Sequence, residues 1–208
     1  MNAQLRRPAA LMALAMLPAA GNAQWLDYAQ ADISSSATTI VLVRAVGTGE
    51  DARPAPIVSG SYTRWSTGEA GGAGFVYRWA LPLESQHWLL GAGVGVNANR
   101  GWAPAAEVRD SALALWLQSE WFGPVPGASY YVLTRASSYR ETWLATAQFS
   151  PADLPVSAEW TRYHEQGYQA TSIGVRVATG VARWFVRLGV TSGNGETSPY
   201  LGVVYNGF

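Results

Sequence analysis

The stretch that decides the fold is Trp184-Phe185-Val186-Arg187-Leu188-Gly189-Val190-Thr191, in which large apolar residues occupy every second position. Residues two apart point to the same face of a β-strand, so this segment predicts a strand with one apolar face and one more polar face. The same alternation recurs at 75–81, 88–96, 113–121, 143–149 and 171–177. The chain is therefore predicted to be all-β.

Repetition of this pattern between turn-forming residues predicts about twelve strands. An even number is typical of bacterial membrane barrels. Ten strands is the alternative, because the first two segments alternate least clearly and the link 47–56 is long. The expected strands lie near 25–33, 38–46, 57–66, 72–82, 87–97, 110–121, 129–137, 141–149, 156–164, 169–179, 182–192 and 197–208.

Composition places these strands in a membrane. Of the 208 residues, 49% are hydrophobic and 13% are charged, whereas about 25% charged residues is usual for a soluble domain. No apolar run after the N-terminus approaches the roughly 18 residues of a membrane-spanning helix. Many of the ten tryptophans and ten tyrosines fall near expected strand ends, where amphipathic rings meet the lipid–water interface. We expect a transmembrane antiparallel up-and-down β-barrel; the alternative is a secreted β-sandwich with an aromatic core.

The first residues predict export. Arg6 and Arg7 precede an apolar run at 9–17, and small residues at 19–23 follow it. This layout is that of a secretory signal peptide, with a buried N-terminal helix as the alternative. The expected organisation is a signal peptide at 1–23 and one barrel domain at 24–208.

Connector lengths predict the orientation. Short links are expected at 83–86, 123–127, 151–155 and 180–182, and longer ones at 66–71, 97–109, 137–141, 165–168 and 192–196. Outer-membrane barrels have short periplasmic turns and longer external loops. With the N-terminus in the periplasm, all four short links fall on the periplasmic side.

The C-terminal segment Tyr200-Leu-Gly-Val-Val-Tyr205-Asn-Gly-Phe208 resembles that of small Gram-negative outer-membrane β-barrel proteins. The resemblance implies that Phe208 is the signal recognised by the barrel-assembly machinery and that outer-membrane lipid surrounds the protein. Tyr200 and Val204 fit the alternate apolar positions of that class, whereas Gly202 and Asn206 depart from them. A second apolar set comprises Leu201, Val203 and Tyr205.

Strand parity directs several charged residues into the lumen, because an arginine facing lipid costs about 2–4 kcal/mol at the midplane. The candidates for lumen lining and solute contact are Arg78, Arg135, Arg176, Arg183, Arg187, Glu120 and Glu159. A turn at 181–182 predicts that Arg176 lies opposite Arg187, with Glu159 neutralising Arg176. Arg187 is then expected to be the less compensated charge.

These residues leave three functions open. The first is a narrow channel or export accessory for small anionic or saccharide solutes, with exopolysaccharide secretion as one setting, since arginines select anions. The second is a structural or adhesive barrel in which Arg–Glu pairs plug the lumen. The third function is a lipid hydrolase using His164. It is the least favoured, because Gln166 stands at the position where such an enzyme would need a serine.

Other chemistry is excluded or not expected. The absence of cysteine excludes disulfides, thiolate metal sites and cysteine catalysis. Equal numbers of basic and acidic residues, 14 each, argue against nucleic-acid binding. His87 and His164 lack the spacing of a metal site, so we expect no metal, no cofactor and no catalytic residue.

Overall fold

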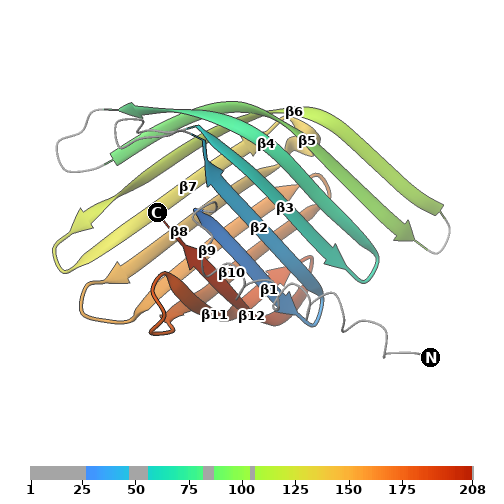
Figure 1. The fold of residues 1–208 in the computed structure, drawn as a ribbon. Coiled ribbons are helices and arrows are strands. Elements are labelled where there is room, and N and C mark those ends of the chain that lie inside the picture. The colour runs from blue at the N-terminus through green and yellow to red at the C-terminus, as the bar shows by residue number, and fades with distance from the viewer. Residues whose placement is uncertain (1–26, 47–55, 82–86, 104–105, 208) are drawn as a thin grey trace.

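The structure is a computed structural model that describes residues 27–46, 56–81, 87–103 and 106–207. These residues form a closed barrel in which every strand is antiparallel to both of its neighbours (Figure 1). The strands are β1 (Tyr28–Ser34), β2 (Ala37–Ala45), β3 (Ile57–Trp65), β4 (Gly68–Leu81), β5 (His87–Ala103), β6 (Ala106–Val125), β7 (Ala128–Ser137), β8 (Trp143–Pro151), β9 (Val156–Glu165), β10 (Tyr168–Ala178), β11 (Trp184–Gly193) and β12 (Glu196–Asn206).

The first and last strands close the barrel. β1 pairs with β12 from Tyr28 opposite Asn206 to Ser34 opposite Tyr200, and each other strand pairs with its neighbours in sequence. The predicted all-β, twelve-strand up-and-down architecture is confirmed, and the ten-strand alternative is wrong. Closure leaves no strand edge exposed, as a lipid environment requires.

The predicted difference in connector length is wrong. The expected long links at 66–71 and 97–109 are mostly strand, because β3 and β4 are separated by two residues and β5 and β6 likewise. Backbone hydrogen bonds between paired strands do not depend on side-chain polarity, so a polar hairpin can continue the ladder beyond the apolar zone. At that end the links of the structure are two residues long except at 138–142, whereas the other end includes longer links such as 152–155 and 179–183. Connector length therefore does not support the predicted orientation.

The outward side chains form an apolar belt. Leu113 is 83% exposed, Leu115 66%, Ile173 61% and Leu201 57%. Outward aromatic pairs lie near the strand ends, including Trp121 with Tyr130 and Trp184 with Tyr205. An apolar band flanked by aromatic rings is the surface that a bilayer covers.

The last strand shows which of its two apolar sets faces out. Leu201 is exposed, whereas Val204 is completely buried and Tyr200 is buried inside the barrel. The odd-numbered set therefore faces the lipid side, and the even-numbered set, with its departures at Gly202 and Asn206, faces the lumen. Phe208, the expected assembly signal, lies outside the described residues, as does the expected signal peptide.

The interior has an apolar half and a polar half. Ile57, Val76, Ala114 and Trp116 form a buried cluster on β3, β4 and β6, and Val43 and Tyr139 pack against it. Most of the buried charged side chains come from the other strands, especially β9, β10 and β11. In the part of the chain that the structure describes, no helix is long and apolar enough to span a membrane.

Candidate functional site

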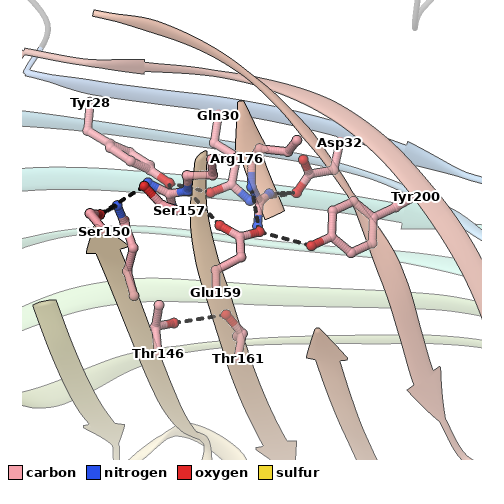
Figure 2. Close-up of polar contacts among 12 residues, drawn as sticks. Tyr28, Gln30, Asp32, Thr146, Ser150, Ser157, Glu159, Thr161, Arg176 and Tyr200 are labelled. Carbon is pink, nitrogen blue, oxygen red and sulfur yellow. Dashed lines mark hydrogen bonds and ion pairs between the residues drawn. The ribbon is translucent and has the colours of Figure 1, made fainter. Parts of the chain in front are cut away.

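A network of charged and polar side chains lines the lumen beside the closing seam. We call it the seam network; Figure 2 shows most of its members pointing toward one another across the interior. It consists of Tyr28, Gln30, Asp32, Glu159, Arg176, Arg187 and Tyr200. These residues come from β1, β9, β10, β11 and β12, so the network ties the start of the barrel to its last four strands.

Glu159 is the centre of the seam network. Its Oε2 accepts a hydrogen bond from Arg176 Nε at 2.5 Å, and its Oε1 accepts from Arg187 and, at 2.9 Å, from the Tyr200 hydroxyl. Its side chain is 2% exposed. A buried carboxylate is stabilised only when charges and donors of this kind surround it.

Asp32 supplies the second acid of the network. Arg187 forms an ion pair with Asp32 Oδ2 as well as with Glu159. Gln30 Nε2 donates to the same Asp32 oxygen at 2.5 Å, and the Tyr28 hydroxyl donates to Gln30 at 2.5 Å. Arg176 Nη2 completes the circuit by donating to the Tyr28 hydroxyl at 3.3 Å.

Glycines make room for this network. Gly189 lies opposite Tyr200, and Gly174 lies opposite both Gly189 and Glu159. A Cβ at Gly189 would approach Tyr200 Cζ to 2.6 Å. The ring of Tyr200 therefore lies flat across two glycine-lined strands and reaches Glu159 on the third.

A second group, which we call the Arg135 cluster, consists of Arg78, Gln118, Glu120, Tyr131 and Arg135. Arg78 Nη1 and Glu120 Oε1 form an ion pair at 3.2 Å, and Gln118 Nε2 donates to the same oxygen at 2.6 Å. The Tyr131 hydroxyl donates to Glu120 Oε2 at 3.3 Å. This cluster belongs to β4, β6 and β7.

Arg135 differs from the other lumenal arginines in its partners. Its Nε and Nη2 donate to the Gln118 amide oxygen at 2.9 and 2.6 Å, and its Nη1 donates to Ser59 at 3.5 Å. Its guanidinium carbon lies 4.9 Å from the ring centroid of Trp116. Among the described residues, none of these hydrogen-bond partners is a carboxylate. The carboxylate of the cluster, Glu120, is bound by Arg78, Gln118 and Tyr131, so Arg135 contacts neutral groups and the ring directly.

Two of the sequence expectations need correction. Arg176 does lie opposite Arg187, as predicted. Arg187 is nevertheless not the less compensated charge, because it is paired with both Glu159 and Asp32. Arg183 does not face the lumen from a strand; it is exposed in the connector before β11, with a φ of 70°.

These corrections change the balance of charge in the lumen. Arg78, Arg135, Arg176 and Arg187 face three acids, Asp32, Glu120 and Glu159, while the inward Glu165 is paired with Arg140. The described lumenal lining thus carries one excess positive charge, which the geometry assigns to Arg135. The sequence alone had suggested a larger excess, because it counted Arg183 and omitted Asp32.

Sequence reasoning also missed Tyr28, Gln30 and Trp116. The segment Tyr28-Ala-Gln30-Ala-Asp32 does alternate polar and small residues, and this period of two was the available signal. Parity also places Trp116 on the inner face, but an inward tryptophan fits only where the neighbouring strands leave space, and no local pattern shows that. Here Gly95 and Gly74 provide the space, and a Cβ on either would lie 2.6 Å from the indole ring.

The histidines do not gather catalytic partners. His164 stacks on the outward Trp143 ring at 5.8 Å, whereas Glu165, next in sequence, points inward and pairs with Arg140 at 3.1 Å. His87 stacks on Phe122. Over the described ranges there is also no group of three or more His, Asp and Glu side chains that could hold a metal ion.

One connector folds over the lumen. Residues 139–141 form a short 3-10 turn between β7 and β8, with Arg140 and Glu141 at φ near 50°. Arg140 pairs with Glu165 of β9, and Tyr139 packs against the apolar cluster. A non-glycine residue at positive φ costs free energy, and the ion pair and packing offset that cost.

A closed twelve-strand barrel with an apolar belt and a polar lumen defines the class of small outer-membrane β-barrels. Two solved structures share the fold over 86% of this chain and 97% of theirs, each at 10% sequence identity. One is the KdgM porin, with a TM-score of 0.54. The other is the KdgM porin in complex with disordered oligogalacturonate, with a TM-score of 0.53. No protein-family model matches the chain, and no curated protein matches it.

Proposed function

We propose that the protein is a non-enzymatic channel of the Gram-negative outer membrane that passes small anionic saccharides. The observation that carries the proposal is the lumenal Arg135, which has an aromatic neighbour and no carboxylate partner among the described residues. An arginine in this state attracts and orients a carboxylate that passes close to it. Saccharides moving outward during exopolysaccharide secretion would meet the same group.

The fold comparison supports the choice of solute. One of the two solved structures that share this architecture is the KdgM porin in complex with disordered oligogalacturonate, a chain of sugar acids. Each unit of such a solute carries one negative charge, and the lumen described here carries one excess positive charge. The two charges are complementary, which favours entry of acidic over neutral sugars.

Replacing Arg135 by glutamine is expected to reduce the anion preference of the channel. The substitution removes the excess lumenal charge while keeping a side chain that can hydrogen-bond to Gln118. The measurement is the reversal potential in planar bilayers under a salt gradient, with Arg183→Gln as a control because Arg183 is exposed outside the strands. An equal shift in both variants, or in neither, would contradict the assignment to Arg135.

A structural barrel with a plugged lumen is the second candidate, and a specific observation favours it. The apolar cluster, with Tyr139 packed against it, and the ion-paired seam network both lie in the interior. Absence of any single-channel current from the correctly folded protein would support this candidate and exclude the channel.

The protein is also expected to partition into the outer membrane and to migrate differently on gels before and after heating. The apolar belt needs lipid around it, and a closed barrel keeps its compact shape in detergent until it is heated. Fractionation of cells followed by electrophoresis of boiled and unboiled samples measures both. Recovery as a periplasmic monomer without heat-dependent migration would exclude this location and the proposed partners, outer-membrane lipid and the assembly machinery.

A further inference from the structure

A row of charged residues crosses the barrel wall near the ends of β3, β4 and β5. The register places Arg64 opposite Glu69 and Glu69 opposite Arg100, and Arg109 of β6 is the register partner of Arg100. Three arginines and one acid therefore occupy four consecutive positions around the wall. We call Arg64, Glu69 and Arg100 the outer arginine row.

The outer arginine row is on the outside of the barrel. Residues two apart on a strand share a face, and Arg100 shares its face of β5 with Val94 and Val96, which are 57% and 53% exposed. Arg64 shares the outer face of β3 with the exposed Tyr62. The Arg100 side chain is 46% exposed, and Arg64 is exposed as well. A ligand therefore reaches this row from the membrane side, without entering the lumen.

The outer arginine row lies at the level where lipid headgroups begin. Trp88, an outward ring near the opposite end of β5, and Arg100 are twelve residues apart on that strand. At about 3.3 Å per residue and a typical tilt of about 40°, this length spans about 30 Å across the membrane, slightly more than the apolar band of about 25 Å. The outward residues between them are all apolar: Leu90, Ala92, Val94, Val96 and Ala98. Arg100 therefore lies just beyond the hydrocarbon region.

The charges of the row favour an anion with two separate phosphate groups. The Tyr62 hydroxyl donates to Glu69 Oε2 at 2.7 Å, and Arg100 Nη1 lies 3.9 Å from Glu69 Oε1. One acid between two arginines leaves the row with one net positive charge. Arg64 and Arg100 are two strands apart, which is about 10 Å. Because a guanidinium binds phosphate through paired hydrogen bonds, two phosphates at the ends of a disaccharide fit this spacing better than two joined by a single glycerol.

We propose that the outer arginine row binds the head of a lipid of the lipid A type, a disaccharide that carries two phosphate groups and several acyl chains. Arg64 and Arg100 each hold one phosphate, and the acyl chains lie along the apolar wall at Val94 and Val96. This site goes beyond the proposed channel function, because it is on the outside of the barrel and does not depend on whether the lumen conducts.

Titration of the detergent-folded barrel with lipid A, followed by native mass spectrometry, tests the site. Arg64→Gln and Arg100→Gln each remove one charge and keep a polar side chain. Each is expected to weaken lipid A binding about fivefold, and the double variant by about the product of the two effects. Arg44→Gln is the matched control, because Arg44 is an exposed arginine near the other end of the wall, on β2. It is expected to leave the affinity unchanged.

The ligands compared provide the second half of the test. Monophosphoryl lipid A has the same kind of acyl chains and one phosphate fewer, and cardiolipin has two phosphates joined by one glycerol; both are expected to bind more weakly than lipid A. Weaker lipid A binding in both row variants, with Arg44→Gln unchanged, supports the site even if bilayers show no current. Equal binding in the wild type and the double variant, an equal loss in Arg44→Gln, or equal binding of the three lipids overturns it. Heat-dependent gel migration verifies that each variant is folded.

Discussion

Replacing Glu159 by alanine is expected to lower the free energy of unfolding by about 3–5 kcal/mol, the usual cost of breaking a buried ion pair from one side. Glu159 accepts hydrogen bonds from Arg176, Arg187 and Tyr200 inside the lumen. Without it, Arg176 keeps only the neutral Tyr28 hydroxyl among its described partners. Arg187 keeps Asp32, so Arg176 accounts for most of the loss.

Urea unfolding of the barrel in detergent micelles, followed by tryptophan fluorescence, measures this effect. Glu196→Ala is the matched control, because Glu196 is exposed at the start of β12. A midpoint equal to that of the control would show that the seam network contributes little to stability. Glu159→Gln provides a graded test, since the amide oxygen can still accept some of these hydrogen bonds and a smaller loss is expected.

The sequence predicted contacts between strands that are neighbours in the chain better than contacts made by the closure of the barrel. Alternation placed Arg176, Arg187 and Glu159 on the inner face, and one turn position fixed Arg176 opposite Arg187. Asp32 is 155 residues from Arg187 in the chain. Its contact exists only because β1 closes on β12 with the register that places Asp32 opposite Gly202 and Gly202 opposite Arg187. No local pattern specifies that closing register.

The ends of the strands were harder to predict than their number. Turn-forming residues such as those at 97–101 indicate a loop when they are considered one at a time. In the structure they continue β5, paired with β6 up to Ala103 opposite Ala106. A hairpin that extends past the membrane carries no demand for apolar residues, so the signal that marks the membrane-spanning part stops before the strands do.

The surroundings of Arg135 could be predicted from the sequence only in part. Arg135 was predicted to face the lumen, but its lack of a carboxylate partner depends on Glu120 being engaged by Arg78 and Gln118. Trp116 stands in a run with Leu113, Leu115 and Leu117, which are outward. Parity assigns it to the other face, yet its role there depends on the glycines of two neighbouring strands.

Those glycines lead to the second large effect. Gly93→Ala is expected to destabilise the barrel by about 3 kcal/mol or to prevent its folding. Gly93 lies opposite Val76 on one side and Trp116 on the other. A Cβ at this position would overlap the backbone carbonyl oxygen of Phe75 and approach Val76 Cα to 2.8 Å. Unlike the end of a side chain, these backbone atoms cannot rotate away, so β4 and β5 would have to separate.

Gly60→Ala in β3 is the control, because it is the same chemical change in another strand of the same wall. A Cβ there would have as its nearest atom the Gly72 carbonyl oxygen at 3.6 Å, an ordinary contact. Its effect is expected to be slightly stabilising, by about 0.4–1 kcal/mol, since alanine restricts the unfolded chain more than glycine does.

The two variants are compared by their yields of heat-modifiable barrel and by their midpoints of urea unfolding. Equal yields and midpoints for the two variants would show that the close approach of β4 to β5 does not require glycine at position 93. If only Gly93→Ala fails, the wall on which Trp116 lies depends on that approach, because Gly74 and Gly95, the glycines beneath the indole, belong to the same two strands.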